Sequence, residues 1–274
     1  MLTLTLKHEL PVPLEAEVLT PDRLASLPLA EVRELPVYLG KRKSRLDEFF
    51  DIDGEPSDEL VIHGRGQRIK SIGRGMTRGR ITIHGDAGMH LGAQMTGGSI
   101  EVFGNASDWV GGEMSGGLIR IHGNAGGQVG AAYRGSLSGM RGGTIIVDGS
   151  AGMEIGMRMR RGTIVIGGPV KDFAGLQMKG GTLFLLSGAE IRTGAWMTRG
   201  TIVSLAPLRL LPTFSYACTY QPTFLHIYAR HLASLGVSIP QDGAAGAYRR
   251  YTGDASVPGK GELLIWQPNG AAAR

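Results

Sequence analysis

The sequence has one cysteine, few aromatic residues (6 %) and no run of 18 apolar residues. A single cysteine, Cys218, excludes an intrachain disulfide and an iron–sulfur cluster held by this chain alone, and it fits a reducing compartment. Without a long apolar run, no membrane span is expected. The N-terminus alternates apolar and polar residues and has no apolar core of a signal peptide. We therefore expect a soluble, cytoplasmic protein.

Charge narrows the class of partner only slightly. Lysine and arginine outnumber aspartate and glutamate, which leaves a formal net charge of +5 at pH 7. Such a balance weakly favours an acidic partner, which at this point could be a nucleic acid, an anionic substrate or an acidic protein.

Glycine and methionine, by contrast, recur in register. Seven methionines lie 19 residues apart, except for one interval of 26; they are Met76, Met95, Met114, Met140, Met159, Met178 and Met197. Three residues after each comes a glycine, followed by an apolar pair at alternate positions, as in Ile81 and Ile83. Repeats of this length, built from short strands and glycine turns, indicate a solenoid. The methionines should form an interior ladder; a thioether metal site is the alternative, but no column of cysteine or histidine accompanies them.

The position between the two inward residues of each strand changes character along the solenoid. The first three coils carry Thr82, Glu101 and Arg120 there, and the next four carry apolar residues: Ile146, Val165, Phe184 and Val203. A contiguous apolar patch is uncommon on the surface of a monomer. We therefore predict that these four residues are covered by the C-terminal segment of this chain, by contact with a partner protein, or by both.

Basic residues gather beside the methionines. They are Arg78, Arg141, Arg160, Arg161, Lys179 and Arg199, with Arg158 just before Met159. Stacked corners would make a ladder of positive charge with a step of about 5 Å per coil. Such a ladder could bind an extended polyanion through charge-assisted hydrogen bonds. The alternative is a solvated corner whose charges only keep the protein soluble.

The interval of 26 residues places an insertion within Ala131 to Gly139. Insertions in solenoids form loops that protrude from one face, often a contact face. Tyr133 and Arg134 are therefore candidates for contact with a partner or ligand, and a solvated bulge is the alternative.

Two further columns contain polar residues. One reads His84, Phe103, His122, Asp148, and the other reads Asp86, Asn105, Asn124, Ser150. His84 and His122 would lie roughly 10 Å apart, two coil steps, which is too far to share a metal ion. Both columns are interpreted as turn residues that hydrogen-bond locally. Carboxylates are scattered among columns, so we predict no catalytic residue and no metal site in this chain.

These patterns predict an all-β fold, a parallel β-helix of about seven or eight coils over residues 58–206. Residues 1–57 should form a small α+β cap with a strand at Leu2–Leu6, a short helix from Thr20 and a charged loop at Gly40–Arg45. Residues 207–274 should supply a capping helix at Pro222–Leu235, a strand at Glu262–Trp266 and a tail from Asn269.

The repeat Met-x-x-Gly-x-Ile-x-Ile-x-Gly-x-Ala-Gly, at Met76–Gly88, Met114–Gly126 and Met140–Gly152, resembles the glycine-rich C-terminal domain of glutamate synthase. It is more similar to the C subunit of formylmethanofuran dehydrogenase and to the C subunit of the bacterial formyltransferase/hydrolase complex. The resemblance extends to the Leu-Thr-Leu start, the segment Pro36–Gly40 and the ending Tyr251–Glu262. The segment Leu211–Pro222 most resembles the bacterial form.

The resemblance implies a right-handed β-helix and a non-catalytic subunit, hetero-oligomeric with formyltransferase and hydrolase subunits in one-carbon (methylotrophic) metabolism. In such complexes formyl moves between tetrahydromethanopterin and a methanofuran-type carrier, formate is released, and zinc belongs to another subunit. We predict that the chain itself binds no cofactor, nucleic acid or membrane, although the carrier's glutamate-rich tail would suit the basic ladder. The alternatives are the C subunit of a methanogen-type formylmethanofuran dehydrogenase, a glutamate-synthase-like spacer, and a stand-alone enzyme that acts on an acidic polymer.

Overall fold

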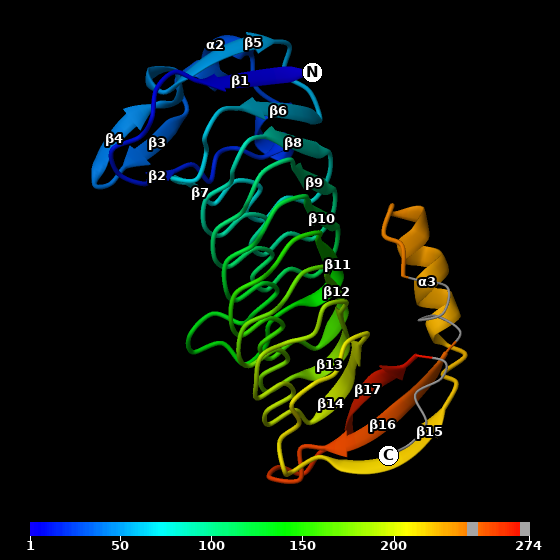
Figure 1. Ribbon diagram of the computed structural model, residues 1–274. Coiled ribbons are helices and arrows are strands. Elements are labelled where there is room, and N and C mark those ends of the chain that lie inside the picture. Colours follow the sequence, from blue (N-terminus) through cyan, green and yellow to red (C-terminus); the bar gives the residue numbers. More distant parts are fainter. Residues whose placement is uncertain (240–245, 269–274) are drawn as a thin grey trace.

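The computed structural model describes residues 1–239 and 246–268, and it shows a rod of stacked coils with a unit at each end (Figure 1). The fold is mostly β, as predicted, with a sheet of 13 strands, a second sheet of four strands and few helices. The tail expected from Asn269 onward lies outside the described residues. None of the helices among the described residues is long and apolar enough to cross a membrane.

One side of the rod is a parallel sheet to which every coil contributes one strand. These strands are β6 (Glu59–His63), β8 (Arg80–His84), β9 (Ser99–Val102), β10 (Leu118–Ile121), β11 (Arg141–Val147), β12 (Arg161–Ile166), β13 (Lys179–Leu185) and β14 (Arg199–Ser204). On the other side, single parallel bridges join the coils through residues 66, 87, 106, 125, 151, 170 and 189. The predicted coil period is therefore confirmed by two lines of parallel pairing.

The interior of the rod is apolar and closed. All seven repeating methionines are completely buried, as are the inward-facing pairs such as Ile81 and Ile83. Glycine is required where the coil turns close to a neighbouring side chain. At Gly111 the backbone has φ +61°, and a Cβ there would lie 2.5 Å from Cδ1 of Ile145 in the next coil. The predicted methionine ladder is confirmed as core packing.

The N-terminal unit extends the main sheet instead of only covering its end. Strand β1 (Leu2–Leu6) pairs in parallel with β6 and antiparallel with β5 (Phe50–Gly54). A smaller sheet joins β2 (Leu14–Glu15), β3 (Pro36–Leu39), β4 (Arg42–Arg45) and β7 (Ile69–Lys70). The helical pieces are α1 (Pro21–Leu24), α2 (Leu29–Arg33) and the 3-10 turn η1 (Leu46–Glu48).

One expectation for this unit was wrong, and the short helix expected from Thr20 forms but ends early. The charged segment Gly40–Arg45 is not a loop, because Arg42–Arg45 forms strand β4, which turns back at Gly40 and pairs with β3. Only Ser44 of this strand is buried, so its three cations stay in solvent without an apolar alternation that would predict a strand. The helix expected from Thr20 ends at Leu24, and a second helix, α2, follows Pro28.

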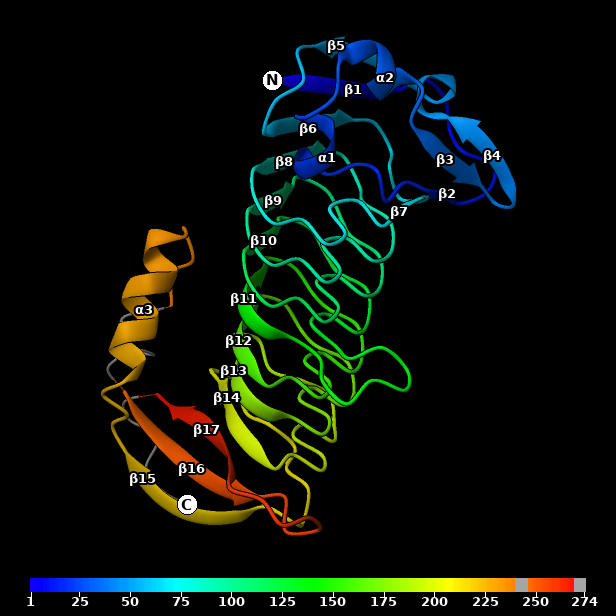
Figure 2. The same ribbon diagram turned by 180° about the vertical axis from the view of Figure 1, so that it is seen from behind.

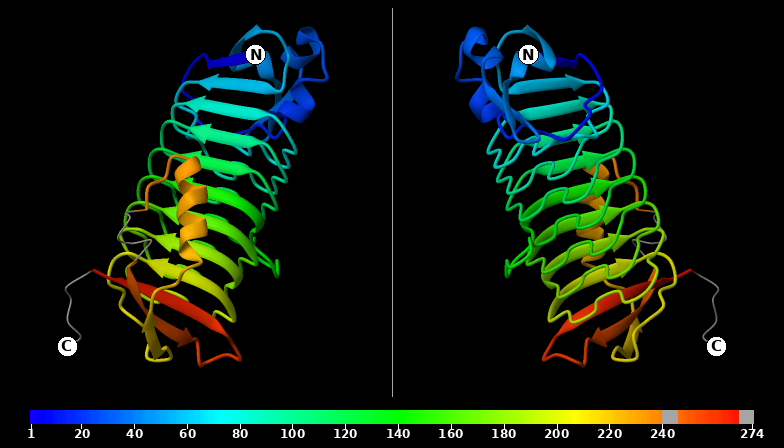
Figure 3. Two further views of the ribbon diagram at one scale, coloured as in Figure 1. Left: turned by 90° about the vertical axis from the view of Figure 1, so that its right-hand side faces the viewer. Right: turned by 90° about the vertical axis from the view of Figure 1, so that its left-hand side faces the viewer.

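The C-terminal unit adds three strands to the main sheet, where only one was expected. Strand β17 (Gly261–Gln267) pairs in parallel with β14, β16 (Ala247–Gly253) pairs antiparallel with β17, and β15 (Ser215–Tyr220) forms the edge beyond β16. Helix α3 (Leu225–Ser234) begins three residues later than predicted and runs along the outer face of the main sheet (Figures 2 and 3).

Helix α3 explains the apolar outer half of the sheet. Ile146, Val165, Phe184 and Val203 are each 1 % exposed and pack in a second core with buried residues of the C-terminal unit: Leu225, Leu232, Val237, Tyr248 and Leu264. This core is distinct from the interior of the rod. The prediction that these four side chains contact a partner protein is therefore corrected, because this chain itself buries them.

The polar outer residues mark where this cover ends. Arg120 donates a hydrogen bond from Nη1 to the backbone oxygen of Leu235, 2.6 Å away, just beyond the C-terminus of α3. The guanidinium also pairs with the carboxylate of Asp148 at 3.2 Å. A cation near the last carbonyls of a helix stabilises it and satisfies groups that have no partner within the helix. Arg120 thus fixes the end of α3 to strand β10.

Candidate functional site

A column of cations occupies one corner of the rod, at the position directly after the methionine. The first coils carry Thr77, Thr96 and Ser115 there, and the next three carry the cations Arg141, Arg160 and Lys179. Backbone hydrogen bonds hold them in register, with Arg160 N donating to Met140 O and Lys179 N donating to Met159 O. We call Arg141, Arg160 and Lys179 the corner column.

The other predicted ladder residues do not extend this column without a break. Arg161 and Arg199 stand one position further on in sequence, at the starts of β12 and β14, where the strand register shifts and places Arg161 opposite Arg141 and Arg199 opposite Lys179. Arg78 lies at the N-terminal end of the rod, where its Nε is 3.6 Å from the Asp58 carboxylate. The predicted ladder is therefore a compact basic patch on coils four to seven, and Arg78 is separate from it.

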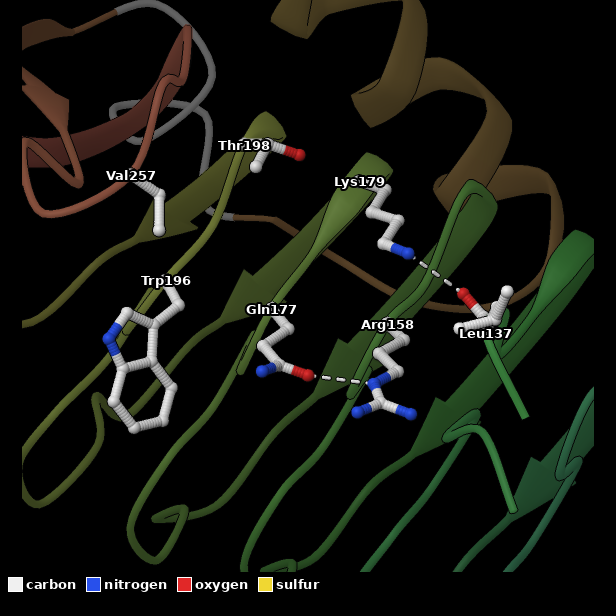
Figure 4. A pocket seen from close by; sticks show the side chains of 7 residues that line it. All are labelled: Leu137, Arg158, Gln177, Lys179, Trp196, Thr198 and Val257. Atoms are coloured by element: carbon white, nitrogen blue, oxygen red, sulfur yellow. Dashed lines mark hydrogen bonds between the residues drawn. The ribbon is translucent and has the colours of Figure 1, made fainter. Parts of the chain in front are cut away.

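A groove of about 450 Å³ lies beside the corner column (Figure 4). Its lining residues come from three places in the chain: the corner, the insertion and the turn before β17. They are Leu137, Arg158, Gln177, Lys179, Trp196, Thr198 and Val257. Arg158, Gln177 and Trp196 each precede an interior methionine and form one row along the groove. Lys179 and Thr198 each follow one and form a second row (Figure 4).

The insertion folds onto these cations. Lys179 Nζ donates to the backbone oxygen of Leu137 at 3.0 Å, and Arg158 Nη1 donates to that of Ser136 at 2.5 Å. Arg158 also donates from Nε to Oε1 of Gln177 at 2.7 Å. All these acceptors are neutral. Within residues 1–239 and 246–268, no carboxylate lies within 4 Å of the corner column or Arg158, so no described residue pairs with their positive charge.

Exposed apolar surface accompanies the charge. The side chains of Leu137 and Trp196 are 70 % and 48 % exposed, and both line the groove. Cations with free hydrogen-bond donors next to a flat aromatic ring suit a ligand that combines carboxylates with apolar or planar groups. Gln177 and Trp196, which line the groove, were not predicted as site residues. Each stands directly before an interior methionine, as Arg158 does, and this shared position is the signal that could have identified them.

Tyr133 anchors the insertion to the rod. Its ring stacks on Trp109 with centroids 4.7 Å apart, and its hydroxyl lies 2.9 Å from Nδ1 of His90. Burial raises the pKa of Tyr133 to about 12 and, together with the nearby Lys70 charge, lowers the pKa of His90. Tyr133 thus has partners within the chain, whereas Arg134 is exposed beside it and stays a predicted contact.

The two polar columns behave differently from one another. The second column hydrogen-bonds from coil to coil, as when Asn105 N donates to Asp86 Oδ1 at 2.7 Å. The first is a stack of rings on the outer face: His63, His84, Phe103 and His122, with successive centroids 4.8, 5.1 and 4.8 Å apart. The rings stack at strand ends and are not turn residues, but the predicted local hydrogen bonds form at His122, whose ring nitrogens lie 2.9 Å from carboxylate oxygens of Asp148 and Glu101. The part of the chain that the structure describes contains no group of three or more His, Cys, Asp or Glu side chains that could hold a metal ion.

Parallel coils with glycines in register and a methionine-filled interior define a glycine-rich solenoid protein. The chain belongs to the family described as GXGXG motif, which matches residues 63–208.

Relatives of this chain are subunits of enzymes of formyl metabolism. The C subunit of the molybdenum-containing formylmethanofuran dehydrogenase 1 of Methanothermobacter thermautotrophicus is 46 % identical over 88 residues, 31 % of this chain and 22 % of that protein. The C subunit of the tungsten-containing formylmethanofuran dehydrogenase 2 of the same organism is 37 % identical over 94 residues, 32 % of this chain and 35 % of that protein. The matches thus span only about a fifth to a third of these curated relatives.

A solved structure is similar over nearly the whole length. It is a chain in the crystal structure of the formyltransferase/hydrolase complex (FhcABCD) from Methylorubrum extorquens in complex with methylofuran. That chain is 34 % identical, with a TM-score of 0.88 over 97 % of this chain and 99 % of that chain. The similarity therefore includes both end units as well as the coils.

Proposed function

We propose that this chain is a non-catalytic, cytoplasmic subunit of a formyltransferase/hydrolase complex. The complex would move formyl from tetrahydromethanopterin to a methanofuran-type carrier and release formate, with zinc on another subunit. The observation that carries the proposal is the similarity, over 97 % of this chain, to a chain of the complex from Methylorubrum extorquens. A methanogen-type formylmethanofuran dehydrogenase is the second candidate, supported by 46 % identity over 88 residues to the C subunit of such an enzyme.

The architecture supports a scaffold role. The coil interior is filled with apolar side chains, and polar columns hydrogen-bond to neighbouring coils, as Asn105 does to Asp86. The chain therefore offers rigid outer surfaces and no enclosed chamber within the coils. In this proposal the coils wind right-handed, seven or eight in number, over residues 58–206, between units at 1–57 and 207–274, in keeping with the usual hand of parallel crossovers.

Co-expression with neighbouring subunits tests the assignment. We expect the chain to co-purify with formyltransferase and hydrolase subunits, and we expect the chain alone to release no formate from a formylated carrier. Molybdenum or tungsten in the purified assembly would favour the second candidate. Turnover by the isolated chain, including turnover of an acidic polymer, would contradict the scaffold role.

We further propose that the basic patch holds the glutamate-rich tail of the carrier. Arg141, Arg160 and Lys179 repeat at about 4.8 Å, the spacing of neighbouring strands, so an extended acidic chain can meet a cation at each step. The groove beside them adds Arg158 and the exposed ring of Trp196. Because no carboxylate of the described chain neutralises these cations, an external anion gains the full attraction.

Charge reversal tests this carrier contact. Replacing Arg160, Arg161 and Lys179 with glutamate should weaken carrier binding by the complex about three- to 150-fold at low salt, since three exposed pairs of roughly 0.2–1 kcal/mol each sum to about 0.6–3 kcal/mol. The loss should shrink as salt screens the charges. The matched control reverses Lys41, Arg42 and Lys43 in the N-terminal unit, which changes the net charge equally. Equal affinities of the two variants would refute the contact.

A further inference from the structure

Among residues 1–239 and 246–268, no strand pairs with the outer edge of strand β15. It pairs with β16 on one side and ends the 13-stranded sheet on the other. Its sequence, Ser-Tyr-Ala-Cys-Thr-Tyr, contains no charge and no proline, and five of its six residues are exposed. Natural proteins usually blunt a free edge with lysine, proline or a covering segment, because unpaired backbone groups invite another strand. Tyr216 alone leaves 57 % of its surface in solvent.

A groove of about 410 Å³ lies on the sheet beside this edge. Leu208 and Leu210, from the segment after the last coil, form one side, and Arg249 and Tyr251 of β16 form the other. The Tyr216 ring meets the Tyr251 ring edge-on with centroids 5.8 Å apart, so the edge strand contacts a residue that lines the groove. Among the described residues, Arg249 has no carboxylate within 4 Å.

We infer that another subunit of the assembly adds an extended segment to strand β15. Its main chain would pair with the free edge, a mode of recognition in which backbone hydrogen bonds provide affinity and side-chain pockets provide specificity. An apolar side chain of the segment would fill the groove, and an aspartate or glutamate would pair with Arg249. The sign of the charge at Arg249, and of the exposed Arg209 nearby, selects an acidic segment.

This inference rests on the proposed function, because it needs a second kind of subunit. It concerns a surface different from the basic patch, which lies at the corner of the coils. The two proposals can therefore fail separately. If the chain co-purifies with larger subunits but β15 stays open, the inference fails and the proposed function stands.

Cys218, in the middle of β15, is the only cysteine of the chain and reports on this edge. Maleimide labelling of the intact complex, followed by mass spectrometry of this chain, measures its accessibility. The reference is Lys43→Cys on the exposed strand β4 of the same chain, combined with native Cys218. In the isolated chain we expect both sites to react at similar rates. In the complex we expect Cys218 to react at least about tenfold more slowly than the reference, because strand pairing buries the edge.

A charge variant gives an independent measurement. Arg249→Glu should weaken the association of this chain with the complex at least about tenfold, since an acidic partner residue would meet a like charge. Arg23→Glu, in α1 at the other end of the rod, is the matched control and should leave association unchanged. Equal labelling rates in the complex would overturn the inference. Protection of Cys218 that appears in the isolated chain with rising concentration would also overturn it, in favour of pairing between two copies.

Discussion

The replacement Phe184→Ala should detach the C-terminal helix while leaving the coils folded. Phe184 is 1 % exposed on the outer face of β13, and its ring lies 5.4 Å from the ring of Tyr228 on α3. It belongs to the second core, which the interior of the rod does not share. Truncating a buried phenylalanine typically costs about 3–5 kcal/mol. Most of that loss should fall on the contact between α3 and the sheet.

Hydrogen exchange read by mass spectrometry separates local from global effects. In Phe184→Ala, the protection of the Leu225–Ser234 amides against exchange should fall by roughly two to three orders of magnitude. This follows from the cost given above, because about 1.4 kcal/mol corresponds to a factor of ten. Amides of β9 and β10 should keep theirs. Leu183→Ala is the matched control, because the adjacent side chain is completely buried but faces the rod interior. It should lower the protection of the coils themselves. Equal losses in α3 and in β9 for Phe184→Ala would refute the division into two cores.

Three further predictions follow from single contacts. Gly111→Ala should lower the free energy of unfolding by about 2–4 kcal/mol in chemical denaturation, because its Cβ would clash with Ile145. The control Gly75→Ala, at a similar φ but with open space around the Cβ, should lower it by only about 1–2 kcal/mol. Equal losses in the two variants would contradict the packing argument. Arg120→Met should cost about 1.5–3 kcal/mol by removing charged hydrogen bonds, seen as faster exchange at the end of α3, and unchanged exchange would contradict this. Burial raises the pKa of Tyr133 to about 12, so the unfolded chain loses this proton at lower pH than the folded chain, and the free energy of unfolding falls as pH rises from about 10 to 12. Tyr133→Phe should reduce that fall, measured by denaturation at each pH. An unchanged dependence of the free energy of unfolding on pH would refute this prediction.

The coils could be predicted because the residues that determine each coil recur at the same positions of every repeat. Each coil places a methionine and an alternating apolar pair in the same interior, so the period of 19 residues carries the strand, the turn and the buried face together. Strand β15 could not be predicted in this way. Its residues are exposed on both faces, so no apolar alternation marks them, and its partner β16 begins some 30 residues later in the chain.

The site was predictable only in part, for a similar reason. Arg141, Arg160 and Lys179 occupy the same position of successive repeats, so the repeat itself predicts that they lie together. The groove also needs the insertion, whose Leu137 carbonyl meets Lys179, 42 residues later. A contact between a loop that does not repeat and a corner that does cannot be predicted from the spacing of the repeats. The covering of Phe184 by α3 was foreseen as one of two possibilities, and deciding between them required the positions of both segments.

Helix α3 also sets how the protein can change in length. From Leu225 to Leu235 it covers about 15 Å, which matches roughly three steps between neighbouring strands. The helix is tied to two different coils: the hydroxyl of its Tyr228 lies 2.9 Å from the hydroxyl of Thr182 on β13, and Arg120 on β10 holds its C-terminal end. Adding or deleting a coil between these points would displace one anchor by about 4.8 Å and break it. Coils between Thr82 and β10 lie outside the span between these two anchors, so natural or designed variation in coil number should be confined to that part of the rod.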